Sequence, residues 1–282
     1  TYGERPILRN VSFRIDQTES VAIMGPSGSG KSTLLRLILG LECPQRGEVL
    51  VDAENICKLR ERQKREIRKR IGMVFQDGAL FDSLTVGENV GYYLLEHTKL
   101  NWDEISDRVE QMLGFVGLIP DQVIDKLPEQ LSGGMQRRVA IARALLSTNP
   151  TVMLYDEPTT GLDPQATETV LSLMNKLTQE KQISTIAVTH QIADAMMLTR
   201  RFIVIHEGEV AFDGEGVGEG RGGTADESAR EVGEARGRSR GGNRKLTIDR
   251  GGGARDKAGQ GDEPRVVHRK ESLPYRLGVF HQ

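Results

Sequence analysis

The sequence contains little cysteine, few aromatic residues and no long apolar run. Its 282 residues include two cysteines, too few for a disulfide-rich scaffold or for a zinc site with four cysteine ligands. No segment approaches the roughly 18 consecutive apolar residues that a membrane-spanning helix requires. The formal net charge of −2 argues against a nucleic-acid partner. The first residues also lack the pattern of a secretory signal, so we expect two unpaired thiols in a reducing, cytoplasmic compartment.

Composition divides the chain near residue 215. Residues 216–282 hold 15 of the 32 glycines, with 14 basic and 10 acidic residues and a net charge of +4. Residues 1–215 hold 24 basic and 30 acidic residues, a net charge of −6. The tail has too few apolar residues to offset the entropy of ordering it. We therefore predict one ordered domain over residues 1–215 and a low-complexity, disordered tail over 216–282, either a genuine extension or the product of a shifted reading frame.

Short apolar runs alternate with segments of helical periodicity over residues 1–215. This alternation is typical of an α/β fold with a mainly parallel sheet. The expected strands are residues 20–24, 47–51, 71–75, 151–155, 183–188, 201–206 and 209–212. The expected helices are residues 31–39, 85–116, 132–147, 163–180 and 191–199, with a basic, solvated helix or loop over residues 59–70. Alternating apolar residues from Ile7 to Ile15 predict a further pair of strands at the start.

A glycine-rich loop between an apolar strand and a helix matches the pattern G-x-x-x-x-G-K-[ST] completely. Its residues are Gly25, Pro26, Ser27, Gly28, Ser29, Gly30, Lys31, Ser32 and Thr33. The glycines let the backbone N–H groups converge on one anion, and the start of the helix adds partial positive charge. Lys31 can reach the β- and γ-phosphates, and the Ser32 hydroxyl can coordinate Mg²⁺. The pattern therefore predicts a nucleotide-phosphate site.

Two carboxylates follow the apolar strand that ends at Tyr155. Asp156 suits the Mg²⁺-holding position of a phosphate-loop enzyme, directly or through water. Glu157 stands one residue further on, where a base could polarise a water that attacks the γ-phosphate. On its own this pair could be an ordinary charged strand end, but beside a complete phosphate loop it indicates a hydrolytic site.

Further motifs resemble those of the ATP-binding-cassette (ABC) ATPases. Leu131–Arg138 (LSGGMQRR) lies between the phosphate loop and the acidic strand and resembles the family's signature motif. Gln76, at a strand end, resembles the Q-loop, and Gly161–Asp163 resembles the D-loop. His190 resembles the switch histidine. Tyr2 stands where the family places the aromatic residue that stacks on adenine, and simple packing within a strand is the alternative for it. The ordered motifs together cover residues 2–213.

The resemblance implies a fold and an assembly. The fold would be a P-loop NTPase ABC cassette: a RecA-like parallel core sheet, an antiparallel β subdomain, and an α-helical subdomain over residues 80–147. Two copies would form a head-to-tail homodimer. Each ATP, with its Mg²⁺, would then lie between the phosphate loop of one chain and a second anion cradle of the other. The residues of that cradle are Ser132, Gly133 and Gly134.

The resemblance also implies residue roles. Glu157 would be the general base, His190 would hold the γ-phosphate and the attacking water, and Asp163 would link the two sites. Gln76 would sense the metal and relay closure of the dimer. The implied metal ligands are Ser32, Gln76 and Asp156. For each of these residues the plain alternative is a polar surface side chain.

The segment after Gln76 points to a subgroup of the family. The run GALFDSLTV, followed by Leu95–Thr98 (LEHT), resembles the ATPases of Mce/Mla-type lipid transport systems. That resemblance implies phospholipid transport through a partner permease that docks on Gln76–Val86, with an Mce-domain protein as a further partner. The chain would then lie at the cytoplasmic face of the inner membrane. The alternatives are the ATPase of another importer or exporter, and a regulatory ATPase of the cell-division type.

Two features depart from the family pattern. Family members have Gly-Glu just before the strand that leads to the phosphate loop, where this sequence has Thr18-Glu19. If that turn requires a positive φ, a threonine there is strained by about 1 kcal/mol or more. The strand that usually precedes the position of Tyr2 is absent, so the adenine side of the site is incompletely built. Thr1 is not an initiator methionine, which suggests a fragment or a processed chain.

Overall fold

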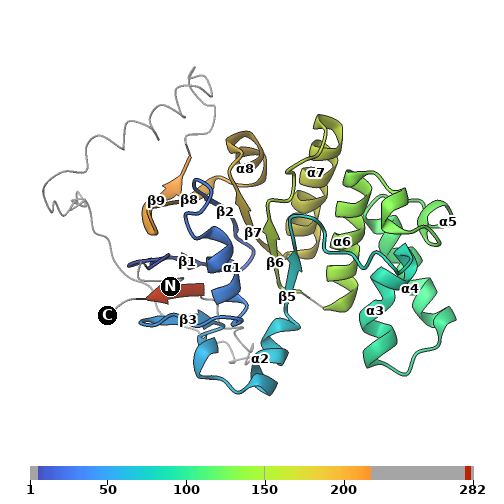
Figure 1. Cartoon of the computed structure of the whole chain (residues 1–282), viewed down its shortest axis with the longest axis horizontal. Coiled ribbons are helices and arrows are strands. Elements are labelled where there is room, and N and C mark those ends of the chain that lie inside the picture. Colours follow the sequence, from blue (N-terminus) through green and yellow to red (C-terminus); the bar gives the residue numbers. More distant parts are fainter. Residues whose placement is uncertain (1–5, 149, 217–276, 281–282) are drawn as a thin grey trace, which may run out of the picture. The chain divides into compact units, whose positions relative to one another are not determined.

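A six-stranded sheet forms the centre of the domain in this computed structural model, which describes residues 6–148, 150–216 and 277–280 (Figure 1). The strands follow the order β5-β6-β7-β2-β8-β9. All neighbours are parallel except β9, which is antiparallel to β8. The strands are β2 (Ser20–Met24), β5 (Ile71–Val74), β6 (Val152–Asp156), β7 (Ser184–Thr189), β8 (Arg201–His206) and β9 (Glu209–Glu215). The predicted α/β architecture is thus confirmed.

The central strands are buried on both faces, which explains their continuous apolar sequence. In β6, Met153 and Tyr155 join one apolar cluster, whereas Val152 and Leu154 join the other. This division follows from the alternation of side chains along a strand. The first cluster includes the helical subdomain, and the second includes the antiparallel sheet and the helix after the phosphate loop.

Helices cover the central sheet and build a separate subdomain beside it (Figure 1). The α-helices are α1 (Lys31–Ile38), α2 (Glu61–Arg68), α3 (Val86–His97), α4 (Trp102–Phe115), α5 (Pro120–Val123), α6 (Gly133–Ser147), α7 (Pro164–Lys181) and α8 (Ile192–Leu198). The described residues also form two 3-10 helices, η1 (Ile56–Lys58) and η2 (Pro128–Gln130). The helix expected over residues 85–116 is two helices, because Asn101 accepts a hydrogen bond from the Glu104 amide and caps a new start.

A second, antiparallel sheet has the strand order β1-β10-β3-β4. Its strands are β1 (Arg14–Ile15), β3 (Glu48–Val51), β4 (Glu54–Asn55) and β10 (Leu277–Phe280). The prediction of a pair of strands between Ile7 and Ile15 is wrong. Only β1 forms there, and its partner is β10 rather than a neighbouring segment.

The strand β10 corrects part of the predicted disordered tail. Its four residues, three of which are apolar, lie between β1 and β3 and pair with both, so backbone hydrogen bonds on two sides order this segment. Residues 217–276, 281 and 282 of that tail, together with Tyr2, lie outside the described residues. None of the helices that the structure describes combines the length and apolarity needed to span a bilayer.

The turn before β2 has a positive φ at Thr18, the conformation considered for this position from the sequence. Thr18 has a φ of 59°, in the left-handed region that disfavours a residue with a Cβ atom. Glu19, the next residue, accepts a hydrogen bond from the Asp16 amide and forms an ion pair with Arg201, and both contacts hold the turn in place. The expected strain at Thr18 is therefore present.

Candidate functional site

Three neighbouring parallel strands bring the predicted catalytic segments together. The phosphate loop follows β2, the two carboxylates end β6, and His190 follows β7 directly. In the register, Met24 lies beside Thr189, and Asp156 lies beside Val188. The carboxyl ends of parallel strands share one edge of a sheet, which is where ligands bind in open α/β folds. The topology thus places segments that are distant in the sequence at one edge.

The phosphate loop is closely packed. A Cβ atom at Gly25 would lie 2.3 Å from the Ile205 carbonyl oxygen, so only glycine fits there. Lys31, 8% exposed, turns back over the loop, and its Nζ donates hydrogen bonds to the carbonyls of Gly25 (2.8 Å) and Pro26 (3.0 Å). The first turn of α1 carries no acidic side chain. The ammonium group and the start of the helix therefore direct positive charge toward the same loop.

Oxygen donors lie next to this positive charge. The Ser29 hydroxyl is buried and has no hydrogen-bond partner among the described residues. The Ser32 hydroxyl donates a hydrogen bond to the Asp156 carboxylate. Burial raises the pKa of Asp156 above its usual value, the neighbouring charge of Glu157 raises it further, and the Ser32 hydrogen bond opposes the shift. A hydroxyl and a carboxylate of this kind are the hard donors that Mg²⁺ takes together with nucleotide phosphates.

Glu157 and His190 meet at the same edge. The His190 Nδ1 atom lies 2.8 Å from the Glu157 Oε2 atom, and the Thr160 hydroxyl donates to that oxygen at 3.1 Å. The Glu157 backbone has a φ of 48°, outside the strand conformation, and its amide donates to the Val188 carbonyl. The Glu157 side chain is 13% exposed, whereas His190 is more than half exposed. Such a held carboxylate has the surroundings expected of a general base.

The signature motif forms a separate pocket of about 200 Å³. Ser132 caps α6 by accepting a hydrogen bond from the Met135 amide, and Asp163 caps α7 by accepting one from the Ala166 amide. The residues lining the pocket are Ser132, Gly134, Arg138, Asp163, Gln165, Ala166 and Thr169. The phosphate loop contributes nothing to this lining. The structure brings Ser132 and Asp163 together, but it does not unite them with the phosphate loop of the same chain.

Gln76 lies on an exposed loop whose backbone carbonyls accept hydrogen bonds from side chains of α6. The loop follows β5, whose last residue, Val74, pairs with Tyr155 beside Asp156. Arg137, a buried residue of the signature helix, donates to the Phe75 carbonyl, and burial lowers its pKa. The conformation of the Gln76 segment is therefore tied to the helix that carries the signature motif.

The sequence did not reveal two further residues that shape this loop. Arg143 of α6 donates to the carbonyls of Gly78 (2.9 Å) and Ala79 (2.7 Å). Asn89, fully buried in α3, accepts from the Phe81 amide and donates to the carbonyls of Phe81 and Leu84. An asparagine on the apolar face of a helix was the one available signal, since a buried amide requires partners.

Three exposed side chains, Phe81, Tyr92 and Leu95, border the loop. We call them the aromatic patch after the two rings. The three side chains are 38–45% exposed, and the Phe81 and Tyr92 rings lie 4.9 Å apart. The guanidinium of Arg143 lies over the Phe81 ring, 5.8 Å from its centre. Aromatic residues and arginine are enriched at protein–protein interfaces, so the patch has the composition of such an interface.

The fold and the site define a phosphate-loop nucleoside triphosphatase. The comparison with known protein families then matches residues 8–160 to the family described as ABC transporter, and the chain belongs to that family. It is an ATP-binding, ATP-hydrolysing cassette of an ABC transporter.

Curated relatives agree with this assignment. The chloroplastic protein trigalactosyldiacylglycerol 3 of Arabidopsis thaliana is 42% identical over 76% of this chain and 66% of its own length. The intermembrane phospholipid transport system ATP-binding protein MlaF of Haemophilus influenzae is 39% identical over 75% of this chain and 79% of its own. A methionine import ATP-binding protein, MetN 1 of Staphylococcus epidermidis, is 41% identical over 72% of this chain and 58% of its own. The chain thus spans less than two thirds of the length of the first and third of these relatives.

The solved structures similar to this chain include a dimeric ATP-binding cassette. A dimeric post-hydrolysis state of the ATP-binding cassette MJ0796, bound to ADP and Pi, superposes with a TM-score of 0.68 and 39% identity. The superposition covers 74% of this chain and 90% of that chain.

Proposed function

We propose that ATP hydrolysis by this chain powers phospholipid transport through a partner membrane permease. The observation that carries the proposal is a continuous set of contacts from the aromatic patch, which we propose as the docking surface, to the signature helix. Arg143 of α6 lies over Phe81 of the aromatic patch and also binds the carbonyls of the adjoining loop. A permease seated on this patch would therefore act directly on α6.

The proposed hydrolytic step rests on this chain's own side chains. Glu157 accepts a proton from the attacking water, and its contact with His190 orients the carboxylate. Lys31 and the start of α1 balance the negative charge of the phosphates. Ser32 and Asp156, with Gln76 as a third oxygen donor, would hold Mg²⁺, which supplies further charge neutralisation when bound.

Hydrolysis should be lost without loss of binding when Glu157 is changed to Gln. The variant keeps the shape of the side chain but removes the basic oxygen, so phosphate release should fall by about 10²-fold or more at saturating ATP. ATP affinity, measured by titration, should stay near that of the unmodified protein. Glu180→Gln, an exposed change near the end of α7, is the matched control. Wild-type turnover in Glu157→Gln would remove Glu157 from the role of base.

Two copies of the chain complete each site in the proposed assembly. The signature pocket lies apart from the phosphate loop of its own chain, so a second phosphate loop must meet it from another copy. A dimeric cassette among the structural relatives supports this arrangement. ATP should therefore drive association of Glu157→Gln in light scattering, and Ser132→Arg should prevent it by blocking the pocket.

Phospholipid is the substrate class in the name of the Haemophilus influenzae relative, and the Arabidopsis thaliana relative is named after a glycolipid. Methionine is the second candidate because the methionine import relatives are equally similar. The chain, expressed in its source organism, should purify with a permease, an Mce-domain protein and bound phospholipid, identified by mass spectrometry. Recovery of a methionine-binding partner instead would support the second candidate.

The docking step has its own control. Phe81→Ser should abolish recovery of the permease and leave ATP binding intact. Phe212→Ser changes a similarly exposed phenylalanine on β9, 42% against 45% exposed, and should leave recovery of the permease unchanged. Equal loss in both variants would mean that the aromatic patch is not the docking surface.

A further inference from the structure

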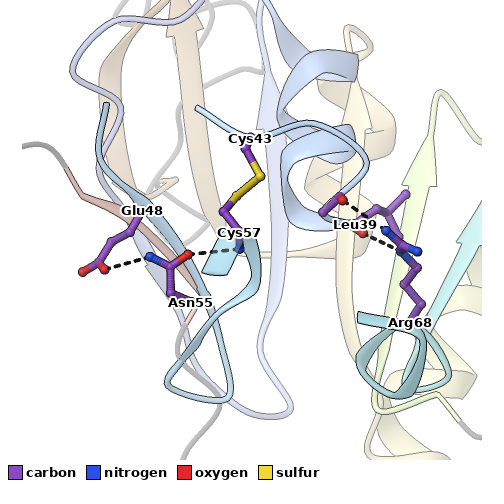
Figure 2. Close-up of a disulfide and its surroundings, with 7 residues drawn as sticks. Leu39, Cys43, Glu48, Asn55, Cys57 and Arg68 are labelled. Atoms are coloured by element: carbon purple, nitrogen blue, oxygen red, sulfur yellow. Dashed lines mark hydrogen bonds between the residues drawn. A yellow bond between two sulfur atoms is a disulfide. The ribbon is translucent and has the colours of Figure 1, made fainter. Parts of the chain in front are cut away.

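The two cysteines, expected to be unpaired, form a disulfide. Cys43 and Cys57 are bonded, with their Cα atoms 5.7 Å apart and a sequence separation of 14 (Figure 2). The expectation of two unpaired thiols is wrong because the residues between Cys43 and Cys57 turn back through the β3–β4 hairpin, which brings the two thiols together. The bond joins the segment that follows α1 to η1.

We propose that Cys43 and Cys57 are a reversible thiol–disulfide modification site that a dithiol reductant opens and a disulfide oxidant closes. The site lies apart from the predicted catalytic residues, and it does not depend on the proposed transport substrate. Two properties of the structure support it: one sulfur is accessible to a reagent, and the other is held in position by contacts that do not involve the bond.

Access to the bond is unequal at its two ends. Cys43 is exposed, whereas Cys57 is partly buried against the apolar cluster of the antiparallel sheet. A reductant thiolate therefore attacks the Cys43 Sγ atom, and the Cys57 thiolate leaves. The second thiol of the reductant then attacks the mixed disulfide, which releases Cys43 and leaves the reductant oxidised. Closure is the reverse: the two thiols lose two electrons and two protons to an oxidising disulfide, which becomes two thiols.

The position of Cys57 does not depend on the bond. Its amide donates to the Asn55 Oδ1 atom at 3.0 Å, and the Asn55 Nδ2 atom donates to Glu48 at 3.1 Å (Figure 2). The adjacent Ile56 is fully buried, and a Cβ atom at Gly40 would lie 2.7 Å from its Cδ1 atom. The end of α1 is thus packed on η1 even without the disulfide. The reduced thiols should stay close enough to bond again.

The other contacts at the end of α1 come from α2. Arg68 donates to the carbonyls of Leu39 (2.9 Å) and Gly40 (3.1 Å), which caps the helix that begins at the phosphate-loop lysine (Figure 2). The disulfide adds a covalent tie to the same corner. Its redox state should therefore change the stability of the 43–57 segment and leave the helical subdomain unchanged.

The test compares the full chain after equilibration with oxidised or with reduced dithiothreitol. Alkylation with a maleimide, read by mass spectrometry under non-reducing conditions, should find no free thiol in the oxidised protein and two in the reduced protein. The melting temperature of the oxidised form should be higher by about 6–12 °C, from the entropy of closing a loop of this length. Reoxidation with glutathione disulfide should restore the higher value.

Variants and exchange measurements distinguish this site from a general effect of the reductant. Cys43→Ser and Cys57→Ser should both melt near the reduced protein and lose all response to dithiothreitol. Amide hydrogen exchange in residues 44–56 should quicken on reduction, while exchange in α6 should not change. Two free thiols under oxidising conditions, a disulfide between two chains, or equal melting temperatures in the two states would each overturn the proposal.

Discussion

Substitution of Gly134 tests how closely the signature helix packs on the neighbouring helix. Gly134 lies in the first turn of α6, where an added Cβ atom would stand 2.7 Å from the Cβ atom of Ala166 in α7. Contacts of that length do not occur, so either the helices separate or the side chains strain. Gly114, near the end of α4, is the matched control because an added Cβ atom there meets nothing within 4 Å.

Gly114→Ala and Gly134→Ala share the gain in helix propensity, but only Gly134→Ala also carries a cost of overpacking. Replacing glycine by alanine inside a helix raises the free energy of unfolding by about 0.5–1 kcal/mol. Gly114→Ala should show only this gain. Gly134→Ala should also lose about 1–3 kcal/mol to overpacking, so its net effect is destabilising. The difference between the two variants then measures the packing term directly, and each 1 kcal/mol should move the melting temperature by about 2–4 °C.

Urea unfolding followed by circular dichroism measures both effects. The m-value should be the same in all variants, so the midpoints report stability. Ala166→Gly in the Gly134→Ala background should recover most of the loss, because it removes the opposing Cβ atom. If Gly134→Ala moved the midpoint upward as Gly114→Ala does, the close approach of α6 and α7 would be refuted.

Three further changes test single features of the site and its surroundings. Asp156→Asn should raise the melting temperature at neutral pH and lower phosphate release by about 10²-fold or more. The raised pKa of Asp156 means that the folded chain binds this proton more readily than the unfolded chain, so stability is lost as pH rises through that pKa, and the variant should lack this loss. Tyr155→Phe should raise the free energy of unfolding by about 1 kcal/mol in urea, since the buried Tyr155 hydroxyl has no partner among the described residues. Thr18→Gly should add about 1 kcal/mol in the same assay by relieving a φ of 59°.

Each of these expectations has a contrary result. An unchanged pH profile of stability in Asp156→Asn would mean that another group carries the shift. A loss of stability in Tyr155→Phe would reveal a partner for the hydroxyl, and a loss in Thr18→Gly would show that the threonine side chain stabilises the turn.

Several parts of the fold were accessible from local sequence. The bounds predicted for β2, α1, α6 and β8 agree with the structure to within one residue, because each has a marked start or end such as Gly30, Ser132 or Pro150. The parallel order of segments followed from the alternation of strands and helices. The positive φ of Thr18 was expected from one position at which the sequence departs from its family.

Residues whose partners are distant carbonyls were not accessible in the same way. Arg137 and Arg143 have the sequence pattern of a polar helix face, yet both bind backbone atoms of the much earlier Gln76 loop. The pairing of Cys43 with Cys57 depends on how one hairpin closes. The placement of β10 between β1 and β3 joins segments from opposite ends of the sequence, and periodicity carries no record of such pairing.

The sequence by itself determined which chemistry to predict for this protein. The spacing of Gly25, Lys31 and Ser32, the carboxylates after Tyr155, and the order of the remaining motifs are local patterns that backbone geometry requires at a phosphate site. The tertiary structure alone decided which groups meet: the contact of Glu157 with His190, the hold of α6 on the Gln76 loop, and the disulfide. The reason is physical, since a short motif specifies its own backbone, whereas contacts between distant segments depend on the register of strands and the packing of helices.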